Sequence, residues 1–151
     1  MVRRFGFPLV VLATLAGMGC SHDGAVDVTW TFVGNEPASS GCGQHGIDSV
    51  VVSGLDSGNN VVRVATLCTP GAARVEVAPG SWTIQVSIFN VLGHPANPDV
   101  PDPTQQVVVT TDAPATVNVV LTPPPPCQDG VDNDGDGRVD KADPDCVNGT
   151  E

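Results

Sequence analysis

The sequence predicts an all-β protein, an antiparallel two-sheet β-sandwich that is followed by a small acidic module at the C-terminus. Valine, isoleucine and threonine occur in short runs, and turn-forming residues, including 17 glycines and 14 prolines among 151 residues, separate these runs. The clearest runs alternate apolar and polar side chains with a period of two, as half-buried strands do. Only 15% of the residues are charged, so the composition is that of a folded chain rather than of a polyelectrolyte tail.

The first 20 residues have the organisation of an export signal. Two arginines precede a mostly apolar run over residues 5–15, and small residues lead to Cys20. The run is shorter than the roughly 20 residues that a membrane-spanning helix needs. A cysteine after small residues resembles the lipobox of bacterial lipoproteins, in which the thiol is acylated after cleavage. The resemblance implies a signal peptide over 1–19, a lipidated N-terminus and tether over 20–25, and anchoring in the outer membrane or at the cell surface; ordinary secretion is the alternative.

The charge of the chain limits its partners. The net charge is −11, and it becomes −13 if Arg3 and Arg4 leave with the signal peptide. Such a surface repels phosphate backbones, so nucleic acid is not expected as a partner. It also repels anionic lipid headgroups, and we therefore expect membrane attachment through a lipid on Cys20 rather than through charge.

The cysteines fit an exported protein with two disulfides. Of the five cysteines, four remain once Cys20 is set aside, and four cysteines allow three pairings. A run of prolines separates the first two from the last two. We therefore expect the pairs Cys42–Cys68 and Cys127–Cys146.

The β-sandwich is expected over residues 26–122. Its three clearest strands begin near Val26, Trp82 and Ala115, and each alternates apolar and polar residues. Because Trp30 and Trp82 share their faces with valine and isoleucine, we expect them in the core rather than on a ligand-stacking surface. No stretch carries a helical apolar stripe of useful length. Weaker strands are expected over 47–53, 61–67, 73–77 and 106–110.

Two connections have strong turn chemistry. Residues 56–60 join two strands through glycine and asparagine, which tolerate positive φ. Residues 78–81 fit a type II turn with Pro79 and Gly80 at its centre. This second turn would close a hairpin over 75–86 that resembles carboxypeptidase-regulatory and transthyretin-like domains. The resemblance implies an Ig-like or transthyretin-like sandwich with an accessory, non-catalytic role.

Motifs of catalysis do not occur in the sandwich sequence. There is no nucleophile elbow, no glycine-rich phosphate loop and no paired-histidine zinc motif. The three histidines are scattered, and His45 in the glycine-rich segment 41–46 is interpreted as a solvated side chain in a flexible loop. We therefore expect that the protein is not an enzyme.

The C-terminal part consists of a polyproline linker over 123–126 and an Asp-rich metal-binding tail over 127–151. Four prolines predict an extended spacer of about 12 Å. In the tail, a calcium-loop register that starts at Asp132 puts carboxylates at positions 1, 3, 5, 9 and 12, and glycine at position 6, where the chain must turn. A start two residues later would put Val139 at the turn, so a single register works. The expected ligands are Asp132, Asp134, Asp136, the backbone carbonyl of Arg138, Asp140 and Asp143.

The tail resembles the loops of EF-hands and of thrombospondin type 3 repeats, and more closely a short metal-binding motif of bacterial surface proteins that is bracketed by cysteines. Carboxylate and carbonyl oxygens suit Ca²⁺, and Mg²⁺ or Mn²⁺ are compatible with them. Copper is disfavoured because the tail has no histidine and its two cysteines are expected to be paired. Prolines on both sides exclude flanking helices, so we expect a structural or weak extracellular site rather than a helix-opening switch.

Together these features predict a non-enzymatic cell-surface lipoprotein with a structural calcium-binding loop. Its expected role is adhesion or envelope interaction, with an unidentified protein or glycan as partner. Two alternatives remain open: a surface protein that handles copper or another divalent ion, and an accessory domain of an exported complex.

Overall fold

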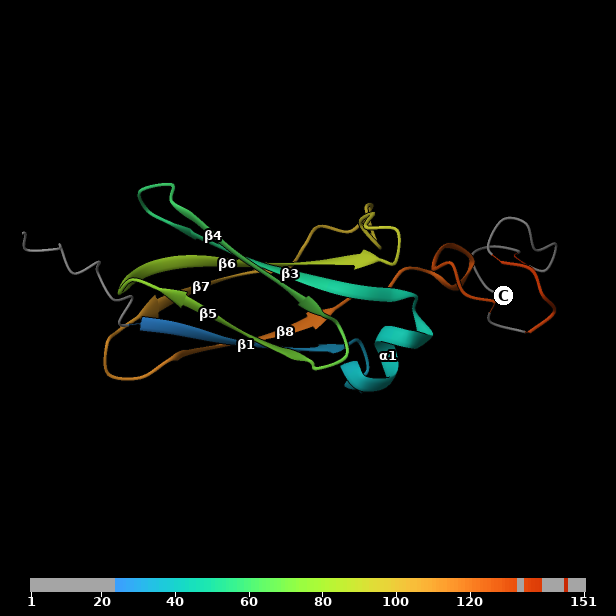
Figure 1. Cartoon of the computed structure of the whole chain (residues 1–151), viewed down its shortest axis with the longest axis horizontal. Helices are drawn as coiled ribbons and strands as arrows, with labels where there is room; N and C mark the ends of the chain where they lie inside the picture. Colours follow the sequence, from blue (N-terminus) through green and yellow to red (C-terminus); the bar gives the residue numbers. More distant parts are fainter. Residues whose placement is uncertain (1–23, 133–134, 140–145, 147–151) are drawn as a thin grey trace, which may run out of the picture.

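A computed structural model describes residues 24–132, 135–139 and 146 of the chain, and within them the predicted two-sheet β-sandwich is confirmed (Figure 1). Each sheet has four strands. Each of the seven expected strands is present, and a two-residue strand, β2 (Glu36–Pro37), adds to them. None of the helices in the described part of the chain is long and apolar enough to cross a membrane.

The first sheet is built around β1 (Gly24–Phe32). It pairs antiparallel with β5 (Ala72–Val77) and with β2, and parallel with β8 (Ala115–Leu121). Among the strands of residues 24–132, this parallel pair is the one exception to the expected antiparallel pattern, and it joins the two ends of the sandwich sequence. Because β1 begins at Gly24, the first two of its residues belong to the sheet and not to the expected tether.

The second sheet is antiparallel throughout. Its strand order is β4 (Val61–Leu67), β3 (Ile47–Asp56), β6 (Gly80–Asn90) and β7 (Thr104–Val109). β3 and β6 are the longest strands and lie side by side at the centre of this sheet, and they carry most of its buried side chains.

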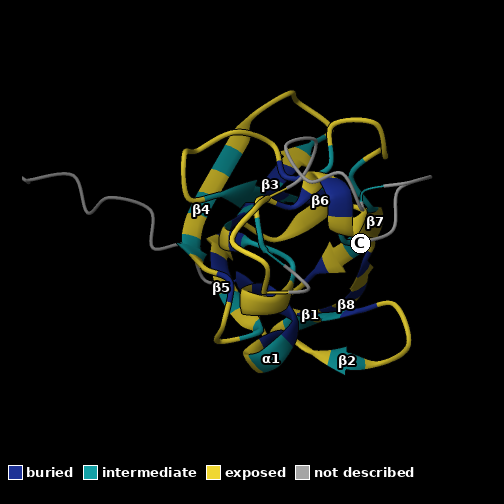
Figure 2. Cartoon of the chain, turned by 90° about the vertical axis from the view of Figure 1, so that its right-hand side faces the viewer, coloured by how far each residue is buried: buried dark blue, intermediate teal, exposed yellow. Residues whose placement is uncertain are grey.

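The core lies between the two sheets and follows the predicted alternation (Figure 2). Trp30 and Trp82 are 2% and 6% exposed, which confirms that both are core residues. Burial of a large apolar side chain contributes about 1.5–3 kcal/mol, so these positions account for much of the stability of the sandwich. The buried apolar side chains of β1 and β6 are Ala25, Val26, Val28, Trp30, Phe32, Trp82, Ile84, Val86 and Ile88.

The predicted turn at residues 56–60 is confirmed. It joins β3 to β4, and Asn59 has a φ of 63° in the left-handed region. The Asp56 carboxylate accepts hydrogen bonds from the backbone N–H groups of Gly58 and Asn60, both at 2.8 Å. Local side-chain chemistry therefore defines this turn, which is why the sequence shows it clearly.

The expected hairpin over residues 75–86 is wrong. β5 belongs to the sheet of β1 and β6 belongs to the sheet of β3, so the connection crosses from one layer to the other. Gly80 has a φ of 147°, far from the value near 80° that a type II turn requires at this position. Val77 and Trp82 on either side are both buried between the sheets. The chain thus changes layer to bury both side chains, and the segment does not support the resemblance to transthyretin-like domains.

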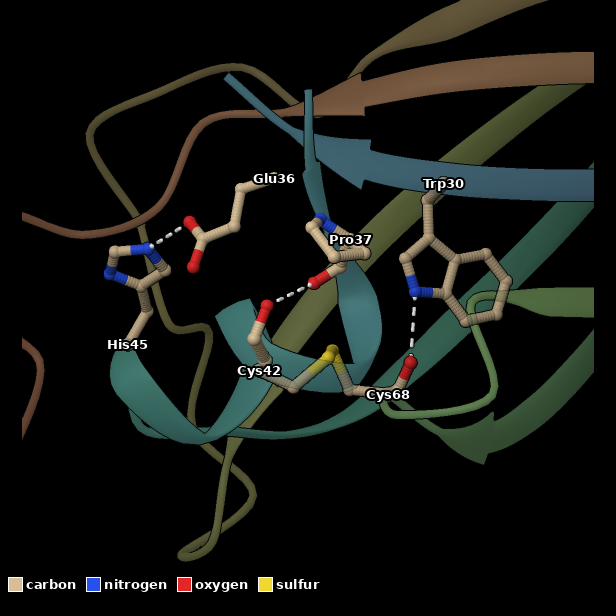
Figure 3. The surroundings of a disulfide bond; sticks show 7 residues. Trp30, Glu36, Pro37, Cys42, His45 and Cys68 are labelled. Carbon is tan, nitrogen blue, oxygen red and sulfur yellow. Dashed lines mark hydrogen bonds and ion pairs between the residues drawn. A yellow bond between two sulfur atoms is a disulfide. The ribbon is translucent and has the colours of Figure 1, made fainter. Parts of the chain in front are cut away.

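A short helix, α1 (Ala38–Gln44), replaces the expected flexible loop. Its sequence is poor in helix-forming residues and contains two glycines, so packing must hold it in place. Gly41 lies directly on the Phe32 ring, where a Cβ would overlap the ring atoms. The Cys42–Cys68 disulfide ties the helix to the end of β4, and this confirms the predicted pair (Figure 3).

Candidate metal centre

The proline run leads from β8 to the tail along the surface of the sandwich. Pro125 has φ −60° and ψ 149°, the extended conformation expected of such a run. Pro124 is buried, however, and the Asn97 side-chain amide donates hydrogen bonds to the carbonyls of Thr122 and Pro123 at 3.1 and 3.2 Å. The run is therefore extended as predicted but lies against the sandwich, and it is not a free-standing spacer.

The tail begins with a disulfide whose first cysteine is buried. A 3-10 turn, η1 (Pro126–Gln128), carries Cys127, which is 5% exposed. Cys127 pairs with Cys146, and their Cα atoms are 5.6 Å apart, so the second predicted disulfide is confirmed. The bond closes a loop around the whole Asp-rich segment. Because Cys127 is buried, the N-terminal end of that loop is held against the rest of the protein.

Asp129 directs the chain from this disulfide toward the Asp-rich segment. Its Oδ1 accepts a hydrogen bond from the Val131 N–H at 2.8 Å, and Gly130 between them has a φ of 76°. Asp129 is 6% exposed, unusually low for a carboxylate. The sequence did not single out Asp129, because its burial depends on the sandwich surface beside it.

Asp132, the first residue of the predicted calcium register, organises the loop that follows. Its Oδ1 accepts a hydrogen bond from the Gly135 N–H at 2.7 Å, and its Oδ2 accepts one from the Gly137 N–H at 2.9 Å. Both glycines have positive φ, 79° and 91°, which side chains rarely adopt. Gly137 is the residue that the register puts at the sharp turn. Two backbone N–H groups thus converge on one half-buried carboxylate.

Asp136 makes the same kind of local contact one step further along. Its Oδ1 accepts a hydrogen bond from the Arg138 N–H at 2.8 Å. Both residues are exposed, and so is Val139 at position 8 of the register. Carboxylate oxygens on a tight glycine-containing turn are metal ligands that suit a hard cation.

The remaining predicted ligands, Asp134, Asp140 and Asp143, lie outside the described residues. Cys20, the predicted lipidation site, and the signal peptide lie outside them as well. Within residues 24–132, 135–139 and 146, no three His, Cys, Asp or Glu side chains gather to form a metal-binding group. The described part of the register therefore provides the turn and Asp132, Asp136 and Arg138.

A polar pair that the sequence interpretation missed, His45 and Glu36, lies beside α1. His45 was expected to be solvated, but its Nε2 lies 3.0 Å from Glu36 Oε2 and its ring is 5.4 Å from the Phe32 ring. In Figure 3 the two side chains point toward each other next to the Cys42–Cys68 disulfide. The pair fastens α1 to β2. No spacing in the sequence signals it, because the two residues meet only once α1 has formed.

Comparisons with known proteins give no family. No protein-family model matches the chain, and no curated protein matches it. Among solved structures, the chain is similar to a leucine-rich repeat protein from Bacteroides thetaiotaomicron, with 14% identity and a TM-score of 0.37. The similarity covers 66% of this chain and 12% of that protein. A likeness of this extent says nothing about function.

Proposed function

We propose that this chain is a non-enzymatic cell-surface lipoprotein whose tail is a structural calcium-binding loop, with a role in adhesion or envelope interaction. The observation that carries the proposal is the double hydrogen bond from Gly135 and Gly137 to the two carboxylate oxygens of Asp132. It occurs in the register that the sequence predicts, with the sharp turn at the expected glycine.

The chemistry of the tail favours calcium. The ion would be held by the carboxylates of the register and by the backbone carbonyl of Arg138, and it would neutralise acids that otherwise repel one another. Both cysteines of the tail are in a disulfide, and residues 127–151 contain no histidine, so soft ligands for copper are lacking. Prolines stand in the sequence on both sides of the loop, Pro126 before it and Pro144 after it, and they disfavour the flanking α-helices that a switch would need. The proposed role of the loop is therefore to fold the tail rather than to switch it.

The decisive experiment is a calorimetric titration of the full chain with calcium after chelation and dialysis. The expected dissociation constant is on the order of 0.1–1 mM, the range of extracellular modules. Asp132→Asn keeps a side-chain oxygen but removes the charge, so we expect it to weaken binding by about tenfold or more. Asp112→Asn is the matched control, because Asp112 is an exposed acid in the loop before β8.

The outcomes separate the candidate functions. No heat and no NMR shift changes at about 10 mM calcium, well above the expected range, would refute calcium binding. Equal affinity in wild type and Asp132→Asn would refute the register. Copper that displaces calcium would instead favour a metal-handling protein. Mass spectrometry of the native protein tests the lipid on Cys20, and an unmodified thiol there would point to ordinary secretion.

A further inference from the structure

The start of the tail contacts the sandwich at Gly46. Gly46, directly after α1, has a φ of 61° and lies against the backbone of Asp129. A Cβ at this position would overlap the Asp129 carbonyl oxygen and would lie 3.3 Å from Val131 Cγ2. The backbones of residues 46 and 129 could not lie so close together if residue 46 had a side chain, so the glycine makes the contact possible.

Burial extends this contact along the start of the tail. Pro124, Cys127 and Asp129 are buried, although all three belong to a segment expected to stand away from the sandwich. Asn97 holds the chain just before them through its two hydrogen bonds to backbone carbonyls. A cavity of about 400 Å³ beside the contact is lined by residues of both parts, among them Ile47, Leu92 and Asp129.

We propose that the end of the sandwich at Gly46 is a docking surface for residues 129–131, and that this docking positions the start of the Asp-rich loop before an ion binds. Asp132 directly follows the docked segment, and the Asp129 side chain fixes the turn that leads to it. A loop whose first ligand is already positioned loses less conformational freedom on binding. Calcium binding and docking are then thermodynamically coupled. Because such coupling is reciprocal, calcium that binds the docked state better must also stabilise the sandwich on which the segment docks. The part that concerns calcium rests on the proposed function, whereas the docking itself does not.

Amide hydrogen exchange on the full chain in chelator tests the docking without any metal. The reporters are the N–H of Gln128, bonded to the Pro125 carbonyl at 2.8 Å, and the N–H of Val131. We expect both to be protected in the wild type and to exchange about tenfold faster or more in Gly46→Ala. Unprotected amides in the wild type, or unchanged protection in Gly46→Ala, would overturn the docking.

Two glycine variants are matched controls. Gly34→Ala imposes the same type of backbone strain, since Gly34 has a φ of 86°, but its Cβ would meet nothing within 4 Å. Gly43→Ala lies in α1 itself, and its Cβ would also be in open space. Both should keep the wild-type protection of Gln128 and Val131. Loss of protection in Gly34→Ala would attribute the effect to strain and overturn the role of the contact.

Asn97→Ala loosens the same segment from another side and does not touch α1. It should accelerate exchange at Gln128 even if Gly46→Ala proves too unstable to purify. If this variant folds and its tail amides stay as protected as in the wild type, the docking proposal is wrong.

Calcium titration of the same variants tests the coupling. We expect Gly46→Ala to bind calcium about tenfold more weakly, within the range of typical coupling, and calcium to raise the melting temperature of the wild-type sandwich, followed by tryptophan fluorescence. Equal affinities in wild type and Gly46→Ala would refute the coupling while leaving calcium binding intact. If the wild type binds no calcium at all, the proposed function and the coupling fail, and the docking is decided by exchange alone.

Discussion

Asp56 and Asp132 use the same local chemistry at opposite ends of the sandwich. Each carboxylate accepts hydrogen bonds from two backbone N–H groups that follow it, and each thereby closes a turn. At Asp56 the turn joins two strands and has no further acids close in sequence. At Asp132 four more aspartates of the register follow. The shared turn chemistry therefore explains the backbone, whereas the additional acids distinguish a candidate ion site from an ordinary turn.

The turn at Asp56 should respond to acid. Hydrogen bonds from Asn60, the side-chain amide first, hold the pKa of the Asp56 carboxyl below its usual value of 3.8. A lowered pKa in the folded state means that the stabilising interaction is complete above pH 3.8 and is lost as the pH falls through the lower folded value. We expect the amide shifts of Gly58 and Asn60 to titrate together in this acidic range.

Asp56→Asn is the test of that assignment, because an amide cannot titrate. The variant should abolish the shared acid transition of the two amides while leaving the rest of the spectrum unchanged. A transition that persists in the variant would assign the titration to another carboxyl.

Among the elements, α1 depends on covalent and tertiary contacts rather than on its own sequence. Cys42 and Cys68 are fully buried, and the Trp30 indole N–H donates a hydrogen bond to the Cys68 carbonyl at 3.0 Å (Figure 3). The disulfide, the indole and the helix thus form one continuous part of the core. A helix with this composition would not persist in isolation.

Removal of the Cys42–Cys68 bond should therefore destabilise the sandwich. In the chain-entropy model, a crosslink that spans 26 residues contributes about 3–4 kcal/mol. We expect Cys42→Ala with Cys68→Ala to lower the free energy of unfolding by at least this amount, measured by urea denaturation, and to expose the α1 amides to exchange.

A control separates the crosslink from the packing of its sulfur atoms. In a Cys127→Ala, Cys146→Ala background, the remaining bond can be reduced without substitution of Cys42 or Cys68. If reduction leaves the stability unchanged, packing alone holds α1, and the estimate for the crosslink is wrong.

The whole molecule has two distinct ends (Figure 1). At one end lie the start of β1 and the loop before β8, which pairs with β1 from Ala115 onward. At the other end lie α1 and the tail. Three residues separate Cys20 from Gly24, so a lipid on Cys20 would hold the first end close to the membrane. The nine residues of β1 span roughly 30 Å, and the Asp-rich loop would face outward at about that distance.

This orientation is testable with lipidated protein in bilayers that contain nitroxide lipids. We expect paramagnetic broadening of the amides of residues 111–113 and little or none at residues 135–138. Cys20→Ser, which cannot be acylated in this way, should show no broadening at either end. Equal broadening at both ends would show that the molecule lies flat, and the outward display of the loop would then be wrong.

The sequence by itself determined the features that rest on short-range chemistry. The alternation of apolar residues predicted seven strands and two core tryptophans, because burial on one face of a strand imposes a period of two. The spacing of aspartates and glycines predicted the turn that Asp132 and Gly137 form. The proline run that separates the cysteine pairs predicted both disulfides.

Only the tertiary structure decided which elements meet. The change of layer after β5, the parallel pair of β1 and β8, and the helix α1 all depend on contacts between distant residues, which have no local pattern. The tail is the clearest case. Its acidic register can be found from residues 132–143 alone, but its attachment depends on the absence of a side chain at Gly46, more than 80 positions earlier in the chain. Whether two backbones pack closely depends on the shapes of both surfaces where they meet. The sequence shows the residues of each segment but not that the two segments meet.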